Sequence, residues 1–573
     1  MREEASMNNR IKPNLRFILV SVFTTTNFLY IGANAQTKDR DKLEENEQVN
    51  VVQDYRPTIA DANKLNDNPV IKDTFKINTK LNYSFLEKQA ITKFELTPIS
   101  AANIKGDVLT KLQNNYFRLG LGNYNTPFAE AYYTTTRSKT QQMGIYGKHF
   151  SSSGTIENLG FSGFSDNQLN GFGKFFVKDH NIHADVNYTR NAMHYYGFDD
   201  AIFDTTLDKN NIKQLYNYIG AKGAFESTYT DTALFNYSGK VNYYYLQDKF
   251  GSAEQNVFIE AGGTKKINTE LYGLNLSYDY FHNSRSIDTT TAGIFRANPY
   301  ARAQNKRWRA KVGFNLIAET DIGKVRFYPD IDFNYNIIKE FMAAYAVLNG
   351  YTERNSYKIL TDINPFVSPS LDLKNTHTTL HINGGLRGKM SANLSYDAGV
   401  DYKRTKDLPL FVNYAANILQ NRFITVYDDV NILNVYGLLA YQAAEKLFVY
   451  TKGNVYQYKT TTELKAWHKP NYDVTIGARY SLKEKIIAKV DVFFIGNQFA
   501  KSDSISTVFP YPAIAYTKTL KGITDVNIGL EYRYTKRLSA FINFNNIAAM
   551  RYERWNNYPT YRFNLLGGVS FCF

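Results

Sequence analysis

The last thirteen residues constrain the fold of this chain more than any other stretch. Apolar or aromatic side chains occupy nearly all odd positions from Tyr561 to Phe573, and polar or small residues occupy most even positions. Successive side chains of a strand point to opposite faces, so this two-residue period predicts a strand with one apolar and one polar face. The strand runs to an aromatic residue at the end of the sequence.

The same alternation recurs along most of the chain, for example at 472–482 and 526–534, where the apolar residues stand at even positions. The chain contains 45 Tyr and 39 Phe, yet its mean hydropathy is −0.41. That average excludes a helical membrane protein. It suits a transmembrane barrel, in which lipid-facing and water-facing residues alternate. We therefore predict an all-β, antiparallel transmembrane barrel.

The N-terminus has the pattern of an export signal. Basic residues up to Arg16 precede the apolar stretches 17–23 and 28–30, and Ala33 and Ala35 are small residues at the positions that a signal peptidase reads. We predict a signal peptide over 1–35, with Met7 as a second candidate start. The alternative is a membrane anchor, but the apolar run is short and broken compared with the roughly 20 residues of a spanning helix. Export favours the outer membrane of a Gram-negative bacterium.

The chain carries a formal charge of +14, and removal of the four basic and two acidic residues in 1–35 leaves +12. Export argues against nucleic acid as the partner of this basic chain. The excess instead predicts loops that contact anionic lipopolysaccharide, or a lumen that favours anions. The alternative is that the basic residues are scattered over the solvated surface and have no specific role. The single cysteine, Cys572, excludes an internal disulfide framework.

Residues 36–113 differ in composition from the rest of the chain and predict a periplasmic N-terminal segment. From residue 114 to 573 the rhythm is that of a barrel, with stretches of about ten residues that suffice to cross a bilayer when tilted. Twenty strands are predicted near 114–124, 127–137, 140–150, 171–179, 181–192, 213–227, 232–246, 256–266, 269–283, 306–318, 324–337, 377–388, 391–404, 421–443, 446–460, 472–482, 485–497, 523–535, 537–548 and 561–573.

Tight connections alternate with long ones in this assignment. Short periplasmic turns are predicted at 178–181, 267–269, 320–323, 388–390, 443–445 and 482–484, and long extracellular loops at 193–212, 284–305, 338–376, 405–420 and 498–522. This asymmetry is typical of outer-membrane barrels. We predict about 20 strands, within a range of 18–22.

Two motifs add a family resemblance. Asn364-Pro365-Phe366-Val367-Ser368-Pro369-Ser370 resembles the Asn-Pro-x-Leu-x-Pro-Glu signature of TonB-dependent receptor barrels, with Val367 and Ser370 in place of Leu and Glu. The run from Phe544 to Trp555 resembles the Asn-Asn-Leu-Phe-Asn-x-x-Tyr segment before the last strand of those receptors. The richness in Tyr, Asn and Lys resembles proteins of Bacteroidota. The chain departs from the family because only the 78 residues of 36–113 precede the barrel and show no plug pattern or TonB box.

No motif with an enforced catalytic geometry is present, so we predict no enzyme, no metal and no cofactor. His377 and His381 are predicted to share a strand face about 13 Å apart, at ~3.3 Å per residue, which is too far for one metal ion. The other histidines are scattered.

Charged residues on the polar phase of the strands are the candidate lumen lining. They are Arg309, Lys311, Arg479, Lys489, Asp491, Glu531 and Arg533. One interpretation is that these residues filter solutes or hold a plug by ion pairs. The alternative is that they have no specific role, because any wide barrel has polar inward side chains. Aromatic residues near strand ends are candidate anchors in the lipid interfaces: Trp308, Tyr472, Tyr480, Tyr561 and Phe573.

Two functions are consistent with the sequence. A barrel of this width encloses more space than side chains can fill, which favours a channel or transport component for solutes, with loops 338–376 and 498–522 as substrate-facing lids. Alternatively, the barrel is a non-catalytic subunit or scaffold of a larger outer-membrane assembly or secretion complex. The predicted partners are outer-membrane lipid and lipopolysaccharide, the barrel-assembly machinery through the strand ending at Phe573, and other periplasmic or outer-membrane proteins.

Overall fold

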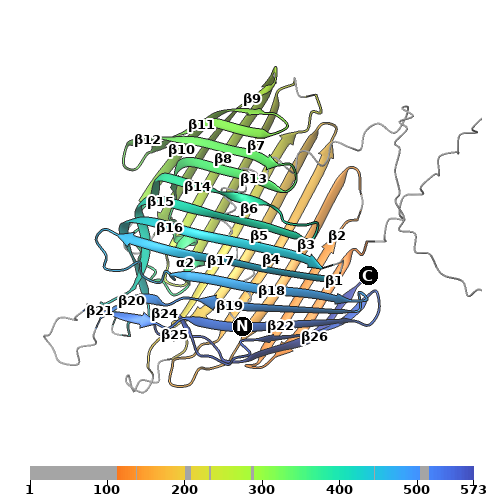
Figure 1. Ribbon diagram of the computed structural model, residues 1–573. Helices are drawn as coiled ribbons and strands as arrows, with labels where there is room; N and C mark the ends of the chain where they lie inside the picture. The colour runs from red at the N-terminus through yellow and green to blue at the C-terminus, as the bar shows by residue number, and fades with distance from the viewer. Residues whose placement is uncertain are drawn as a thin grey trace, which may run out of the picture. The chain divides into compact units, whose positions relative to one another are not determined.

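The computed structural model describes residues 112–136, 138–199, 208–231, 234–284, 290–417, 419–443, 446–503 and 515–573. They form a closed antiparallel barrel of 22 strands (Figure 1). The first strand, β1, pairs with the last, β26, from Tyr116 opposite Cys572 to Gly122 opposite Leu566, and this pairing closes the sheet. The predicted signal peptide and nearly all of the predicted N-terminal segment lie outside the described residues.

The barrel strands follow one another in chain order, each pairing with its neighbour. They are β1 (Asn115–Gly122), β2 (Thr126–Thr134), β3 (Gln141–Ser152), β4 (Phe164–Val177), β5 (His180–His194), β6 (Lys213–Ser227), β7 (Asn236–Asp248), β8 (Ala253–Ile267), β9 (Glu270–Ser284), β10 (Thr290–Gln304), β11 (Trp308–Glu319), β12 (Lys324–Ile338), β13 (Met342–Glu353), β14 (Thr376–Lys389), β15 (Leu394–Asn413), β16 (Phe423–Ala443), β17 (Leu447–Thr460), β18 (Tyr472–Leu482), β19 (Ile486–Ile495), β22 (Ile523–Arg533), β23 (Leu538–Asn545) and β26 (Asn564–Cys572).

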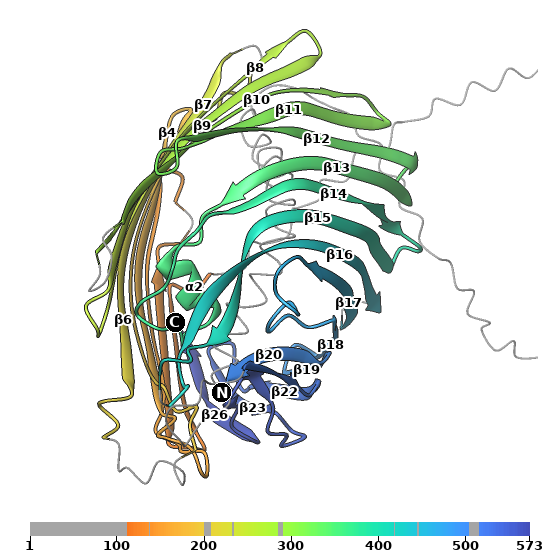
Figure 2. The same cartoon turned by 90° about the vertical axis from the view of Figure 1, so that its left-hand side faces the viewer.

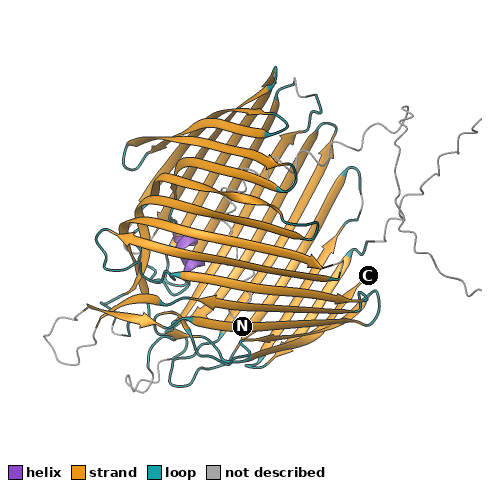
Figure 3. Ribbon diagram, in the orientation of Figure 1, coloured by secondary structure: helices purple, strands orange, loops and turns teal. Residues whose placement is uncertain are grey.

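Two short strand pairs and one short helix lie in the connections. The hairpin β20 (Gln498–Asp503) and β21 (Ala515–Leu520) follows β19, and the short pair β24 (Glu553–Trp555) and β25 (Tyr558–Pro559) precedes β26. One helix, α2 (Tyr357–Ile363), lies between β13 and β14 (Figure 3). Among the described residues no helix is long and apolar enough to cross a membrane.

The two ends of the barrel differ in their connections. The chain enters β1 and leaves β26 at the short-turn end, where β4 and β5 are joined through 178–179 and β8 and β9 through 268–269. The opposite, long-loop end carries the connections 195–212, 354–375, 414–422, 461–471, 496–522 and 546–563. Strands β15 and β16 are the longest, with 20 and 21 residues, and at this end their residues 408–413 and 423–428 pair with each other.

The prediction of about 20 strands is close, but two strands were missed, β10 and β13. The residues of β10 that face away from the lumen are mostly small (Gly293, Ala297, Ala301 and Ala303) and include Pro299, which cannot donate to the ladder, so the apolar phase is faint. Strand β13 is apolar on both phases over Ala343–Leu348 and therefore shows no alternation. Both strands fell within predicted long loops, 284–305 and 338–376.

The omission reversed the predicted direction of the two strands between β10 and β13. Strands β11 and β12 run opposite to the predicted sense, and their turn at 320–323 lies at the long-loop end rather than at the end predicted as periplasmic. The strands outside this region keep their predicted directions, because the two added strands restore the alternation.

The main apolar core lies inside the barrel at the long-loop end. We call it the mouth cluster. Its buried members come from β3–β7 and the connections between those strands, from α2 and the residues after it, from β15–β16 and from the loop before β26. In Figure 2, α2 lies between the wall that carries β4–β6 and the wall that carries β15–β16. A barrel of this size has room for such a core because its own side chains cannot fill the lumen.

Candidate functional site

The register of the strands separates an outward from an inward face. Leu119 of β1 is 57% exposed and Val569, its partner on β26, is 50% exposed, whereas the next residue along β26, Ser570, is buried. Exposed apolar side chains share the phase of Leu119 around the barrel, and polar side chains occupy the other phase. The first face suits lipid and the second suits a water-filled or protein-filled interior.

All seven predicted lumen residues lie on the inward phase, in two groups. On β11, Arg309 pairs with Asn334 and Lys311 pairs with Asp332. The Lys311 ammonium also lies 2.6 Å from a carboxylate oxygen of Asp330. This group therefore has its basic side chains matched by the two aspartates of β12.

The second group lies on β18, β19 and β22. Arg479 stands directly opposite Lys489, so two like charges are adjacent, and the Lys489 ammonium lies 2.7 Å from the Asp491 carboxylate. The Asp491 carboxylate also accepts a hydrogen bond of 3.0 Å from the Tyr450 hydroxyl. Farther toward the short-turn end, the Arg533 guanidinium lies 3.2 Å from the Glu531 carboxylate.

Four of the five predicted interface aromatics lie on the outward phase. Tyr472 is 40% exposed at the long-loop end, and Tyr480 is 41% exposed near the short-turn end. Trp308 is partly exposed at the start of β11. Phe573 is 47% exposed and stacks on Phe117 of β1 with 6.0 Å between ring centroids.

Tyr561 corrects that prediction. It belongs to the mouth cluster, stacks on Tyr124 with 4.6 Å between ring centroids, and its hydroxyl donates to the carbonyl oxygen of Gly154 over 2.9 Å. Strand β26 begins only at Asn564, so Tyr561 lies in the preceding loop, which folds inward.

The connection between β13 and β14 enters the barrel, and we call residues 354–375 the inserted loop. Its helix α2 begins at Ser356, whose hydroxyl accepts from the Ile359 N–H over 3.1 Å. The carboxylate of Glu254 on β8 accepts from the Tyr357 and Lys358 N–H groups over 2.7 and 3.3 Å. A carboxylate at a helix N-terminus satisfies donors that have no partner within the helix. The barrel wall thus caps the inserted helix.

The Tyr357 side chain fixes the same helix to β7. Its hydroxyl donates to Asp248 over 2.8 Å, and Gln214 donates to the same carboxylate oxygen over 3.1 Å. Burial raises the pKa of Tyr357 well above its ordinary value, and the nearby Tyr216 and Asp248 add to the effect. The phenol therefore stays protonated and acts as a donor.

The residues after α2 connect the wall that carries β7 and β8 to the opposite wall, which carries β16. The Tyr195 hydroxyl donates to the Val367 carbonyl over 2.8 Å, while Phe366 and Ser368 exchange backbone hydrogen bonds with Phe423 of β16. The Phe366 ring also stacks on Tyr558 with 3.7 Å between centroids. The segment that resembles the receptor signature therefore lies at the centre of a bridge across the mouth.

His468, in the loop between β17 and β18, belongs to the same packing. Its ring contacts Trp555, its Nδ1 donates to the Phe411 carbonyl over 3.0 Å, and its Nε2 accepts from the Asn556 N–H over 3.3 Å. Burial lowers the pKa of His468 to about 4. The neutral ring is therefore the form that fits this site.

The predicted relation between His377 and His381 is wrong. A β-bulge lies between Thr378 and Leu380, so that His377 pairs with Lys406 while His381 pairs with Lys403 on the opposite face. His381 bonds to Asp401 over 2.8 Å. Across the described part of the chain, no group of three or more His, Cys, Asp or Glu side chains is arranged to hold a metal ion.

The inserted loop was predicted as part of a long, substrate-facing loop, but its anchors were not predicted. Glu254 and Asp248 stand on the polar phase of ordinary strands, and nothing in their local sequence distinguishes them from other lumen residues. The Ser356 cap before an apolar stretch was the one available signal for α2.

Comparison with solved structures identifies the class of fold. The chain is similar to the FrpB iron transporter from Neisseria meningitidis, with a TM-score of 0.62, 9% identity, and coverage of 81% of this chain and 82% of that one. A variant of the ferric enterobactin receptor PfeA from Pseudomonas aeruginosa gives 0.59, with 10% identity and 80% of each chain covered. The copper transporter OprC gives 0.56, with 12% identity and 80% of each chain covered.

The chain therefore shares its fold with this iron transporter, this ferric enterobactin receptor and this copper transporter. No protein-family model matches the chain, and no curated protein matches it either.

Proposed function

We propose that this chain is a non-enzymatic transport component of a Gram-negative outer membrane, related to the TonB-dependent receptors, in which the inserted loop acts as the gate of the long-loop end. In this proposal the long-loop end is extracellular and the short-turn end periplasmic. The fold shared with metal and siderophore transporters supports transport, and the receptor-like motif in 364–370 supports the relationship.

One observation carries the gate: the inserted loop bonds to both walls of the mouth. It is capped by Glu254 on one side and pairs with Phe423 on the other. Both contacts would have to break before a solute could pass between these walls. The inward-facing charges would select the transported solute, together with the ligand or partner that releases the inserted loop.

The predicted absence of a plug belongs to this proposal as well. We propose that movement of the loops, rather than displacement of a plug by TonB, opens this barrel. Deletion of residues 36–111 tests the part that this segment plays in closing the lumen.

The test is single-channel conductance in planar bilayers. The full-length chain, a variant with 357–371 replaced by a Gly-Ser linker, the 36–111 deletion, and the combined variant are compared after each is shown to be a folded barrel by its heat-modifiable gel mobility. We expect the full-length chain to be closed and the combined variant to conduct steadily. Steady conductance of the full-length chain would contradict the gate.

A folded combined variant that remains silent would favour the second candidate, a scaffold in a larger outer-membrane assembly. The mouth cluster is the observation that favours it, because a lumen bridged by a buried apolar core suits an anchor as well as a gate. Isolation of stable partners with a silent barrel would then replace the transport proposal.

A further inference from the structure

The barrel wall splits at the long-loop end between β12 and β13. The two strands pair from Ile338 and Met342 up to Asp330 and Asn349, and beyond that point residues 324–329 pair with β11 alone. The lower nine residues of β12 are enough to cross a bilayer. The split therefore lies at the edge of the apolar belt rather than within it, where unpaired backbone would be costly.

Beyond the split, β13 and β14 turn inward behind β11 and β12. The Asn315 side chain donates to the Gly350 carbonyl over 2.9 Å, and a Cβ at Gly350 would lie 2.6 Å from the Tyr328 ring. Arg326 bonds to His377 over 3.1 Å and forms an ion pair with Glu319. The Asn315–Gly350 and Arg326–His377 bonds hold the two layers together, so the split is stabilised by specific contacts.

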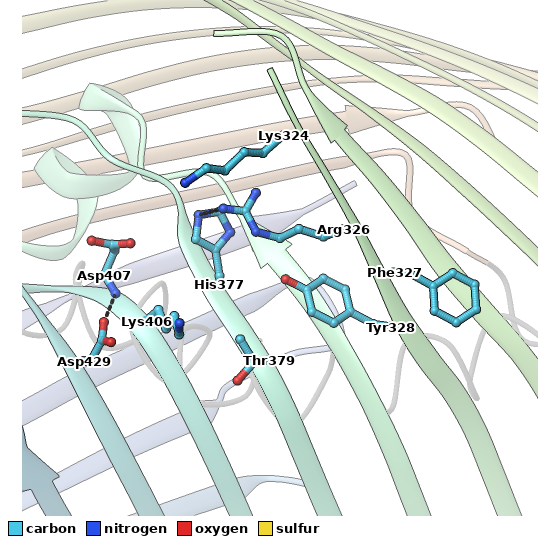
Figure 4. A pocket seen from close by; sticks show the side chains of 9 residues that line it. All are labelled: Lys324, Arg326, Phe327, Tyr328, His377, Thr379, Lys406, Asp407 and Asp429. Atoms are coloured by element: carbon cyan, nitrogen blue, oxygen red, sulfur yellow. Dashed lines mark hydrogen bonds between the residues drawn. The ribbon is translucent and has the colours of Figure 1, made fainter. Parts of the chain in front are cut away.

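The split leaves a cavity of about 670 Å³, which we call the seam pocket (Figure 4). It is lined by the free edge of β12 and by the outward faces of β14, β15 and β16: Lys324, Arg326, Phe327, Tyr328, His377, Thr379, Lys406, Asp407 and Asp429.

The polar lining combines cations with hydrogen-bond acceptors. Arg326 is neutralised by Glu319, but neither Lys324 nor Lys406 forms an ion pair with a described residue. The carboxylates of Asp407 and Asp429 line the same cavity. Lysines bind phosphate, and carboxylates accept from hydroxyl groups. This mixture suits a phosphorylated sugar better than a bare anion.

An apolar surface adjoins the seam pocket. Val325 and Phe327 point outward and are 68% and 64% exposed, the largest exposures among the apolar residues of β12. In Figure 4 the Phe327 side chain is directed away from the cationic groups. Cations beside an outward apolar strip are the arrangement that an anionic lipid requires, with its head group on the lysines and its acyl chains along the wall.

We propose that the seam pocket binds the phosphorylated glucosamine head group of lipopolysaccharide in the outer leaflet. Lys324 and Lys406 contact the phosphate, Asp407 and Asp429 accept from sugar hydroxyls, and acyl chains lie along Val325 and Phe327. The orientation relative to the membrane rests on the proposed function, but binding in detergent does not depend on transport or on orientation.

The test measures binding of purified lipid A to the full-length chain in detergent micelles by native mass spectrometry and by titration. The Lys324→Ala/Lys406→Ala double variant is expected to bind about thirty-fold more weakly, at roughly a factor of five or more for each lysine near an anionic lipid surface. The Lys324→Arg/Lys406→Arg variant should retain most of the binding. Lys306→Ala/Lys536→Ala, which removes two exposed lysines at the short-turn end, is the matched control and should bind as the parent chain does.

Equal binding by the parent chain and the Lys324→Ala/Lys406→Ala variant would overturn the proposal, as would an equal loss in the Lys306→Ala/Lys536→Ala control. Soluble glucosamine 1-phosphate distinguishes the two sources of this chemistry. If it binds the parent chain as tightly as lipid A does, the pocket is a soluble sugar-phosphate site and the lipid proposal is wrong. Conductance tests the proposed function separately, so the two failures are distinguishable.

Discussion

The Glu254→Ala substitution should release the inserted loop while leaving the barrel wall intact. Glu254 is fully buried, and its carboxylate accepts from the N–H groups of Tyr357 and Lys358 and from the Tyr244 hydroxyl, the last over 2.6 Å. The substitution removes the acceptor of two loop donors, the Tyr357 and Lys358 N–H groups, whereas Tyr244 belongs to the wall and its hydroxyl also lies 3.4 Å from the Ser356 hydroxyl. Each buried donor left unpaired costs about 1–3 kcal/mol. With two such donors in the loop, the docked state should lose about 2–6 kcal/mol, and about 3 kcal/mol is a conservative value.

A loss of that size has a measurable consequence for opening. At 1.4 kcal/mol per factor of ten, about 3 kcal/mol raises the population of the undocked loop by roughly two orders of magnitude. Hydrogen exchange of the amides in 357–363 reports this local opening directly, because exchange from a locally unfolded state follows its free energy. We expect those amides to exchange about a hundred-fold faster while the amides of the strands keep their protection.

Glu260→Ala is the matched control for this measurement. Glu260 lies on the same strand and face, but its side chain is 43% exposed and its nearest ion-pair partner, Lys240, is 4.0 Å away. That variant should leave exchange in α2 unchanged. If Glu254→Ala also leaves exchange in α2 unchanged in a folded barrel, the wall does not hold the loop through this carboxylate, and the proposed gate is wrong.

Two further predictions concern the mouth cluster. The pKa of His468 is lowered in the folded state to about 4 from its ordinary value of 6.5, so the folded state resists protonation. Its contribution is complete above pH 6.5 and falls by up to about 3 kcal/mol as the pH drops to 4; urea unfolding at pH 7.5 and 4.5 should show the loss, and His468→Leu should show less of it. Phe366→Ala removes a buried ring from the stack with Tyr558, and a cost of about 3–5 kcal/mol is expected at the mouth; proteolysis within 354–375 should then accelerate, and an unchanged rate would show that the ring does not anchor the loop.

The barrel could be predicted because the alternation of apolar and polar side chains that identifies a strand is a local property of the sequence. The alternation of side chains within a strand shows which residues lie on each face. The segment 526–534 can therefore be assigned as a strand without reference to its neighbours. The rule failed where one face lost its signal. The outward face of β10 consists mostly of small residues, and β13 is apolar on both faces, so in neither strand does an apolar lipid-facing side contrast with a polar lumen-facing side.

The mouth could not be predicted in the same way because its contacts join distant parts of the chain. Tyr195 bonds to a carbonyl 172 positions away, and Tyr196 bonds to one 363 positions away. Tyr561 illustrates the consequence. By periodicity it belongs with the outward residues of the last strand, yet its ring is buried inside the barrel because Gly154 and Ser162 provide acceptors for its hydroxyl.

The barrel wall and the inserted loop differ in how many bonds hold them, and this difference would let the proposed gate move while the wall stays intact. The strands are joined by continuous backbone ladders, whereas the inserted loop is held by a small number of side-chain anchors at Glu254, Asp248 and Tyr195 and by two backbone bonds to Phe423. Breaking the anchors costs a few kcal/mol, but opening the barrel wall would break a whole ladder. A ligand or partner that competes for these anchors could therefore move the loop while the barrel stays closed, which is the separation of stabilities that a gated transporter requires.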